Sequence, residues 1–234
     1  MLVFGSGLTT LGTIRLLASA GLKPFVVSDT PGFVAKSRWY RPAPQSASNE
    51  NPRENLRAWL GGLSLERAVL LACSDEWVLR VARCADEFRE RFPTSVSSPE
   101  VLETLIDKWR LAAVLTELGL PHPRTMAIDP STALADIPDA AIDGAFIKPR
   151  DSTRFFRKFQ VKGFHVTSRA DLGRRLEELS KLGLAVELQE YIPGPSSNYF
   201  YVEGFVDKSG EFSALFTRQR LRMHPPDFGN STLF

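Results

Sequence analysis

Three stretches, FIKPR (146–150), KFQVKGFHVTS (158–168) and VELQEYIPG (186–194), decide the fold of the second half of this 234-residue chain. Each combines apolar, β-branched and aromatic residues next to turn residues, which predicts a strand. The first two stretches carry lysines, and the third ends in a carboxamide, a carboxylate and an apolar residue. Lysines suit a polyphosphate, and a strand edge with apolar walls suits a purine. The pattern therefore predicts an ATP site.

Lysines at three positions are the candidate phosphate contacts. Lys148 lies in an apolar strand and precedes a proline, which favours an anion contact over a lysine that extends from a sheet edge into water. The second stretch is expected to pair with the first, which places Lys162 near Lys148. Lys108 is expected to begin a helix capped by Asp107. An anionic ligand there would offset the unfavourable interaction, about 0.3–1 kcal/mol, between its charge and the helix dipole.

The third stretch supplies the candidate adenine contacts. Adenine needs one hydrogen-bond donor and one acceptor from a strand edge, together with apolar walls. Glu190 and Ile192 are placed to offer backbone groups, and Gln189 lies near enough for the exocyclic amine. We expect the basic and aromatic segment RDSTRFFRK (150–158) to be a mobile loop that can fold over the phosphates.

Between the second and third stretches the spacing predicts an amphipathic helix. Ser168 and Asp171 form a capping box at its start, and Gly183 ends it. After the third stretch, NYFYVEGFVD (198–207) and EFSALFTRQRLR (211–222) predict an antiparallel hairpin.

Three arginines alternate along the second arm of that hairpin. A strand has a side-chain period of two, so Arg218, Arg220 and Arg222 are expected on one face. Guanidinium groups in such an arrangement favour carboxylate or phosphate binding. The other interpretation is a solvated sheet edge.

The first half of the chain begins with a strand, a GSG loop (5–7), a helix and a second strand that ends at Asp29. This order predicts a parallel α/β sheet. A glycine loop at a helix N-terminus can bind a dinucleotide, with Asp29 on the ribose. However, Thr10 replaces the third glycine of that fingerprint. A tight turn is therefore favoured over a nicotinamide site.

An acidic residue follows the third apolar strand. Asp75, in SDEW (74–77), lies where parallel sheets bind ligands, so it is a candidate substrate contact. Helix capping explains this position equally well. The domain boundary is expected between residues 98 and 99.

Composition limits the possible partners. Lys and Arg number 29 against 27 Asp and Glu, so the charge balance gives no indication of nucleic-acid binding. The two cysteines, Cys73 and Cys84, are expected to be buried thiols of a cytoplasmic protein. No signal peptide or bilayer-spanning run is recognised, so no membrane association is expected.

Six motifs together resemble one family. They are SDEW (74–77), IDKWRLAAVLTELGLPHPRT (106–125), FIKP (146–149), QVKGFHVTSRADL (160–172), LQEYIPGPSSNYF (188–200) and TRQRLRMHPPDFGNST (217–232). In this order the motifs resemble those of the ATP-grasp carboxylate–amine ligases. The greatest likeness is to the D-aspartate-ligase-like and carbamoyl-phosphate-synthase-like predicted carboligases.

The resemblance implies an α/β protein with two domains. A Rossmann-like pre-ATP-grasp domain would span residues 1–98, and an α+β ATP-grasp domain lacking its C-terminal part would span 99–234. ATP and Mg²⁺ would take part in joining a small carboxylate to an amine through an acyl phosphate. A homodimer is also compatible with the resemblance.

The resemblance also assigns roles to individual residues. Lys108 and Lys148 match the family's phosphate-binding lysines, and Lys162 matches a lysine of the subgroup. The adenine-binding strand would include Glu187, Gln189, Glu190 and Ile192. Arg222 matches an arginine before a proline-rich turn, so Arg220 and Arg222 are candidate catalytic residues. Arg218 joins Asp75 as a candidate substrate contact.

Two departures from the family pattern leave alternatives open. Residues 150–158 replace a glycine-rich phosphate flap, and the family's magnesium ligands, a glutamate and a later Glu-x-Asn pair, would follow the last residue. The magnesium ligands are therefore not assigned. The alternatives are a nicotinamide-dependent oxidoreductase that uses the GSG loop and a nucleotide-binding fragment without catalysis.

Overall fold

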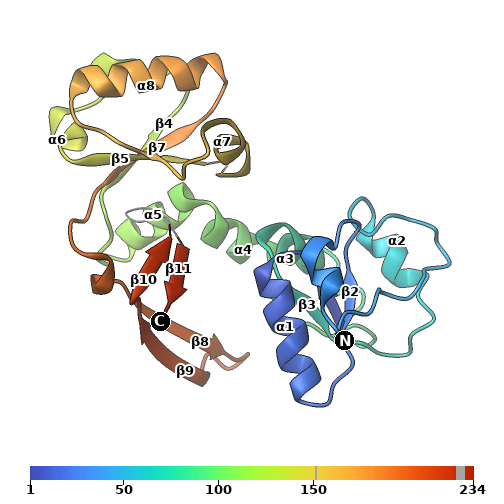
Figure 1. Cartoon of the computed structure of the whole chain (residues 1–234). Coiled ribbons are helices and arrows are strands. Elements are labelled where there is room, and N and C mark those ends of the chain that lie inside the picture. Colours follow the sequence, from blue (N-terminus) through green and yellow to red (C-terminus); the bar gives the residue numbers. More distant parts are fainter. Residues whose placement is uncertain (151, 225–229) are drawn as a thin grey trace. The chain divides into compact units, whose positions relative to one another are not determined.

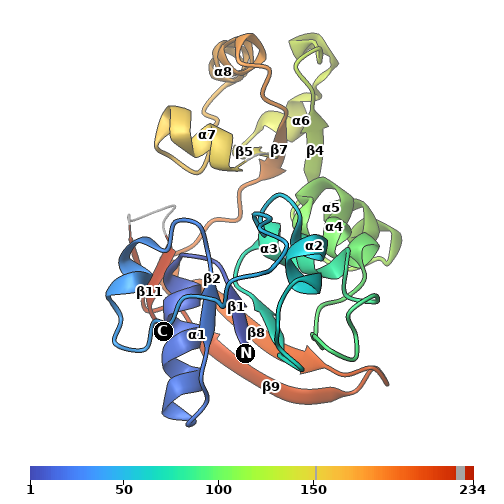
Figure 2. The same cartoon turned by 90° about the vertical axis from the view of Figure 1, so that its right-hand side faces the viewer.

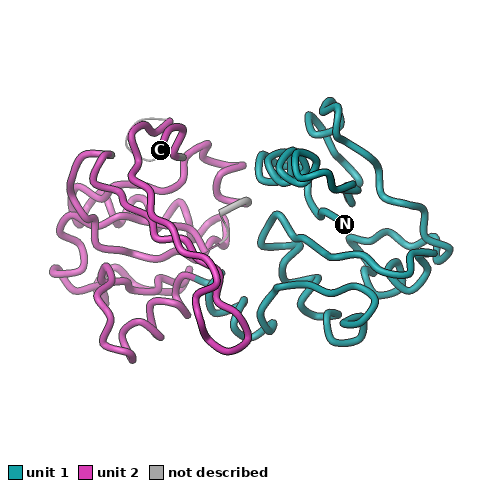
Figure 3. Tube along the Cα trace, turned by 90° about the horizontal axis from the view of Figure 1, so that it is seen from below, with its two compact units in different colours: residues 1–107 teal, residues 108–234 magenta. Residues whose placement is uncertain are grey.

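The computed structural model describes residues 1–150, 152–224 and 230–234. Contacts divide the chain into two compact units, Met1–Asp107 and Lys108–Phe234 (Figure 3). Helix α4 (Pro99–Ile106) contacts α3 of the first unit. The boundary expected between residues 98 and 99 therefore lies one helix earlier than the division by contacts. Each unit is described by itself.

Unit 1 is a small parallel α/β sheet, as the strand–loop–helix–strand pattern predicts. Its elements are β1 (Leu2–Phe4), α1 (Leu8–Ser19), β2 (Phe25–Val27), the 3-10 helix η1 (Gly32–Lys36), α2 (Leu56–Gly61), β3 (Leu70–Ala72), α3 (Asp75–Ala82) and α4. The strand order is β2–β1–β3, and both pairings are parallel.

Alternation along β1 divides the core of unit 1 between the two faces of its sheet. Leu2 and Phe4 belong to a cluster with Trp59 of α2 and Trp77 of α3. Val3 belongs to a second cluster, with Ile14 of α1. Figure 2 shows α1 on one side of the strands and α2 with α3 on the other. Both faces are therefore covered, as expected for a parallel sheet.

Unit 2 contains a four-stranded sheet and a separate hairpin. Its elements are α5 (Lys108–Glu117), β4 (Thr125–Ile128), η2 (Leu134–Asp136), α6 (Asp139–Ile142), β5 (Ala145–Pro149), α7 (Ser152–Phe159), β6 (Phe164–His165), α8 (Arg169–Lys181), β7 (Val186–Glu190), η3 (Ser196–Asn198), β8 (Phe200–Val206), β9 (Phe212–Gln219), β10 (Arg222–His224) and β11 (Asn230–Leu233). The sheet order is β4–β7–β5–β6, with antiparallel neighbours throughout. The three strands predicted from the opening stretches are therefore present.

One face of this sheet forms the core of unit 2. Ile147 of β5 and Leu188 of β7 are register partners and are both buried. They belong to one cluster with Leu172 and Leu179 of α8, and Figure 1 shows this helix lying across the sheet. The opposite face of the sheet remains available for polar side chains.

The ends of α8 follow the sequence signals. Ser168 is its N-cap, and its hydroxyl accepts the backbone N–H of Asp171 at 3.1 Å. The Asp171 carboxylate accepts the N–H of Thr167 at 3.3 Å. Gly183, with φ +59°, follows the helix, in a conformation that glycine adopts without a steric penalty. The N-cap at Ser168 and the glycine that ends the helix are confirmed, whereas the Asp171 carboxylate accepts from Thr167 and not from the N–H of Ser168, as a capping box requires.

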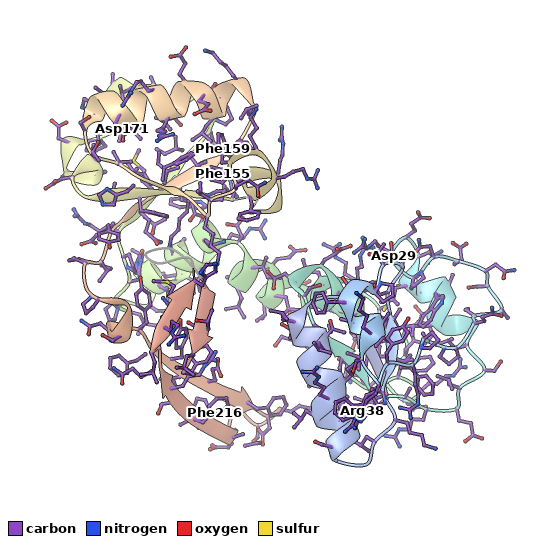
Figure 4. The ribbon with its side chains drawn as sticks, in the orientation of Figure 1. Asp29, Arg38, Phe155, Phe159, Asp171 and Phe216 are labelled. Atoms are coloured by element: carbon purple, nitrogen blue, oxygen red, sulfur yellow. The ribbon has the colours of Figure 1, made fainter. Side chains whose placement is uncertain are left out.

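The segment between β5 and β6 is a helix, so the expectation of a mobile loop over 150–158 is wrong for the residues described. Phe155 is fully buried, and its ring centroid lies 4.7 Å from that of Phe159 and 5.2 Å from that of Phe164. Phe155 and Phe159 both lie below α8 in the view of Figure 4. Arg154 donates hydrogen bonds to the Leu182 and Gly183 carbonyls at 2.5 and 3.4 Å. Because aromatic packing fixes this helix, folding over a ligand would require removing a buried ring.

The predicted C-terminal hairpin forms, but its second arm is shorter than expected. Strands β8 and β9 pair from Phe200↔Gln219 to Val206↔Phe212. Strand β9 ends at Gln219, and β10, which pairs with β11, begins only at Arg222. The expectation that Arg218, Arg220 and Arg222 share the face of one strand is therefore wrong. Much of the hairpin is exposed, including Phe200 at 69% and Val202 at 71%.

We expect Phe155→Ala to destabilise unit 2 by about 3–5 kcal/mol, because it removes a buried aromatic ring. Phe156→Ala is the matched control, since the Phe156 side chain is 47% exposed; its effect is expected to stay within about 0.5 kcal/mol. Urea unfolding measures both. Trypsin should cleave α7 faster in Phe155→Ala only, and equal cleavage of both variants would contradict the anchoring role of Phe155.

Candidate functional site

The polar face of the unit 2 sheet carries the candidate ATP residues. The register pairs Lys148 with Glu187 and Phe146 with Gln189 across β5 and β7, and Thr125 of β4 with Gln189. Residues directly opposite each other in an antiparallel sheet share a face. These five side chains therefore lie on the face opposite the apolar core.

A cavity of about 400 Å³ opens on this face. Its walls come from the segment before β4, from β5, from the end of β7, and from the chain that continues beyond β7. The lining residues are Pro123, Phe146, Lys148, Gln189, Glu190, Tyr191, Ile192, Pro193, Gly194, Pro195, Asn198, Tyr199 and Phe200. Four of the predicted ATP contacts, at positions 148, 189, 190 and 192, thus meet at one cavity.

Lys148 is a cation whose ammonium group is partly desolvated by burial. Burial lowers the pKa of its ammonium group, and the positive charge of Lys108 lowers this pKa further, while the Glu187 carboxylate partly opposes both effects. Glu187 is fully buried. The structure therefore brings the two predicted phosphate-binding lysines within electrostatic reach of each other. An anionic ligand would relieve the repulsion between them.

Gln189 has a different environment from the one expected. Its side-chain carbonyl accepts a hydrogen bond from Lys148 Nζ, and its amide nitrogen donates to Thr125 Oγ1 at 3.0 Å. The carboxamide is therefore engaged along the sheet. The sequence predicts that Gln189 binds the exocyclic amine of adenine. That amine would compete with Lys148 for the side-chain carbonyl oxygen of Gln189.

The end of β7 is anchored on one side. The Glu190 N–H donates to the Arg124 carbonyl at 2.8 Å, and the Glu190 carboxylate accepts from Arg124 N and Nε at 3.1 and 3.4 Å. The hydrogen bond from the Arg124 backbone N–H, together with its guanidinium, lowers the pKa of Glu190. Glu190 thus fixes the strand end and keeps its negative charge.

Ile192 follows this anchored strand end. Its side chain is 57% exposed and lines the cavity. Within the described part of the chain, its backbone N–H makes no hydrogen bond to another backbone group. This N–H is a suitable donor for a purine nitrogen, as the sequence predicts.

Lys162 lies outside the cavity lining. It precedes β6 and its side chain is exposed. The pairing of β6 with β5 is confirmed, with Ile147 opposite Phe164. The adjoining Gly163 passes so close to β5 that an added Cβ would lie 2.3 Å from the Ile147 carbonyl oxygen.

Arg220, predicted to be catalytic, is only 8% exposed. Its guanidinium donates to Ser231 Oγ at 2.6 Å and to the Tyr201 hydroxyl, and approaches Met223 Sδ at 3.1 Å. The guanidinium carbon also lies 4.0 Å from the Tyr199 ring centroid. These contacts link the β8–β9 hairpin to the paired strands β10 and β11, which gives Arg220 a structural role.

Arg218 and Arg222 have different surroundings. Arg218 forms a salt bridge with Glu203 and lies over the Phe234 ring at 3.6 Å. Arg222 begins β10 and is exposed. The catalytic role of Arg222 and the substrate role of Arg218 stay predictions.

Unit 1 contains the remaining candidates. Asp75 is exposed in the first turn of α3, whose N-cap Ser74 accepts the Trp77 N–H at 3.4 Å. Asp29 pairs with Arg53 at 3.5 Å and lines a separate cavity of about 550 Å³. The ion pair between Asp29 and Arg53 would have to rearrange for Asp29 to hold a ribose.

Among the described residues, no group of three or more His, Cys, Asp or Glu side chains is placed to hold a metal ion. The same part of the chain contains no helix that is long and apolar enough to cross a bilayer.

Two features of the cavity wall, and one residue behind it, were not anticipated from the sequence. Thr125 holds Gln189, Phe146 forms a wall, and Tyr199 with Phe200 lines the side that follows η3. Phe146 could have been found from its period-two relation to Lys148 on the same strand. Thr125 could have been found only by pairing β4 with β7, which requires the sheet order.

Comparison with known proteins identifies the fold. No family model and no curated protein matches the sequence. The ADP complex of an N5-carboxyaminoimidazole ribonucleotide synthetase matches with a TM-score of 0.65 at 12% identity, covering 95% of this chain and 54% of the other. The corresponding enzyme from Thermus thermophilus matches with a TM-score of 0.63 at 16% identity, covering 96% and 55%.

The D-alanine–D-alanine ligase from Bacillus anthracis, complexed with ATP, gives a TM-score of 0.53 at 13% identity, covering 93% of this chain and 70% of the ligase. All three structures are ATP-grasp ligases. This chain has the ATP-grasp fold. It spans about half the length of the two synthetases. The α/β fold class, with a Rossmann-like unit before the ATP-grasp unit, is confirmed.

We expect Lys108→Gln to raise the pKa of Lys148 toward the ordinary value of 10.5, because it removes a nearby positive charge. NMR titration of ¹³C-methylated lysines measures this pKa. Lys181→Gln is the control, since Lys181 lies on α8 and pairs with Glu177; it should leave the Lys148 titration unchanged. An unchanged titration in Lys108→Gln would show that the two lysines do not interact.

Proposed function

We propose that this chain is the ATP-binding part of an ATP-dependent carbon–nitrogen ligase. The observation that carries the proposal is the position of Lys148. Its partly desolvated ammonium lines the cavity, Lys108 adds a second positive charge nearby, and the chain just beyond β7 offers the Ile192 N–H on the same cavity. This combination fits a polyphosphate joined to a purine.

The size and lining of the cavity support a nucleotide. A volume of about 400 Å³ lies in the range of small-molecule sites, about 300–1,000 Å³. Phe146 and Ile192 provide apolar surface for a base, while Lys148 provides the charge. Two of the solved structures with this fold are complexes with ADP and ATP, which agrees with the proposed ligand.

The proposed reaction has two steps. A carboxylate oxygen attacks the γ-phosphorus of ATP, the bond to the bridging oxygen breaks, and ADP leaves. An amine nitrogen then attacks the acyl carbon, phosphate leaves, the nitrogen loses a proton, and an amide remains. Phosphoryl transfer depends mainly on positioning and charge neutralisation. Lys148 and Lys108 would neutralise phosphate oxygens in the first step.

The rest of the ligase proposal rests on the fold. The relatives with known structures are ligases that extend well beyond the region matched here, so the complete activity and its substrates belong to the proposal. Among the described residues, no group of three or more His, Cys, Asp or Glu side chains is placed to hold Mg²⁺, and the ligands of that ion are not assigned.

We expect ATP to bind this chain, and Lys148→Ala to weaken ATP binding by about 10- to 100-fold, because a hydrogen bond between charged groups is lost. Isothermal titration, with and without Mg²⁺, measures the affinity. Lys181→Ala is the matched control, because it removes an exposed lysine that pairs with Glu177 on α8; it should bind ATP as the unmodified chain does.

NAD is the second ligand for this titration. Binding of NAD without binding of ATP would overturn the ligase proposal and favour the glycine loop of unit 1 as the site. Equal ATP affinity in the unmodified chain and in Lys148→Ala would place the nucleotide elsewhere.

We expect ATP binding to be accompanied by proton uptake between the lowered pKa of Lys148 and the ordinary value of 10.5. In this range the free protein has lost part of the Lys148 proton, and a polyphosphate restores the charged form. ATP affinity should therefore fall as pH rises through this range. Titrations in buffers of different ionisation enthalpy measure the uptake, which should disappear in Lys148→Ala. Proton release on binding would contradict the assignment.

A further inference from the structure

We propose that Thr125 and Gln189 are positioning residues that aim the Lys148 ammonium at the phosphates of the bound nucleotide. The inference rests on the proposed function and concerns how this site is built. Three strands contribute one residue each, β5 through Lys148, β7 through Gln189 and β4 through Thr125. The three side chains form a hydrogen-bonded row across the sheet.

The strand register brings the row together. Thr125 lies directly opposite Gln189, and Gln189 lies directly opposite Phe146, two residues before Lys148 on β5. Lys148 is therefore a diagonal neighbour of Gln189 on the same face, within reach of a long side chain. Lys148 Nζ donates to Gln189 Oε1, and Gln189 Nε2 donates to Thr125 Oγ1 at 3.0 Å.

Thr125, at the end of the row away from Lys148, fixes the direction of each hydrogen bond. The Thr125 hydroxyl donates its only proton to the Pro123 carbonyl at 2.9 Å, so its oxygen can only accept from Gln189. The amide nitrogen of Gln189 must then face Thr125, and its carbonyl must face Lys148. The reversed amide would place two donors, the NH₂ and the ammonium, against each other.

The row restricts a flexible side chain. A lysine ammonium is a point charge on a four-carbon stem with several rotatable bonds. Anchoring one of its three protons on Gln189 holds the nitrogen at the cavity wall, where both Lys148 and Gln189 are lining residues. The remaining protons stay available to phosphate oxygens, and less side-chain entropy is lost on binding.

The test is a comparison of ATP with adenosine by isothermal titration. Thr125→Val keeps the β-branched shape and removes the hydroxyl, so we expect ATP affinity to fall about 3- to 10-fold with adenosine affinity unchanged. Thr125→Ser should restore ATP affinity. In a Lys148→Ala background, Thr125→Val should have no further effect, because the two residues act through one interaction.

Equal losses of ATP and adenosine affinity would overturn the proposal and indicate a general structural defect. An additive effect in the double variant would overturn it as well. Failure of the unmodified chain to bind ATP or adenosine would instead refute the proposed function, and a second measurement then tests the row without any nucleotide.

The second measurement is competitive acetylation followed by mass spectrometry. The Gln189 carbonyl stabilises the charged form of Lys148, so Gln189→Met should lower the Lys148 pKa and raise its acetylation rate severalfold at pH 8 relative to Lys181. Thr125→Val should act in the same direction with a smaller effect. Unchanged Lys148 reactivity in Gln189→Met would show that Gln189 does not hold the Lys148 ammonium, which overturns the proposal.

Discussion

The arrangement of unit 2 depends on the pairing of Lys148 with Glu187 across β5 and β7. Glu187 is fully buried, and a buried carboxylate without a nearby positive charge costs several kcal/mol. A register slip of one residue would turn Lys148 toward the core face, where Ile147 and Leu188 pack beneath α8. The buried carboxylate opposite Lys148 and the apolar face therefore specify the same register, and that register places the ammonium at the cavity.

The parts of the fold that could be predicted are those governed by local rules. Alternation in the three opening stretches indicated strands, and the caps at Ser168 and Gly183 fixed the limits of α8. The candidate site residues that could be predicted are those whose position follows from a single strand, namely Lys148 on β5 and the residues at the end of β7. These predictions need only the side-chain period and the cap residues, and both can be read from neighbouring positions.

The errors arose where tertiary packing decides the outcome. The basic composition of residues 150–158 suggested a mobile loop. The i, i+4 pair Phe155 and Phe159 instead anchors α7 in the core. The row of arginines suggested one strand, yet the chain leaves β9 before Arg220 and packs that guanidinium against Tyr199 and Ser231. The i, i+4 spacing of the two phenylalanines is local, but the core that buries Phe155 and the partners of Arg220 come from elsewhere in the chain, so local composition alone does not predict either outcome.

Arg220 and Lys148 differ in how many of their N–H donors are bound to protein groups. This difference distinguishes a structural cation from one that can bind a ligand. All three nitrogens of Arg220 contact protein groups, so binding a ligand would break contacts between the β8–β9 hairpin and strands β10 and β11. Lys148 commits one proton to Gln189, which leaves donors beside the cavity. A site for a transferable phosphate requires a cation that is oriented but not saturated. Lys148 Nζ donates to the neutral carbonyl of Gln189, whose amide nitrogen donates to Thr125; under the proposed function, this arrangement meets that requirement.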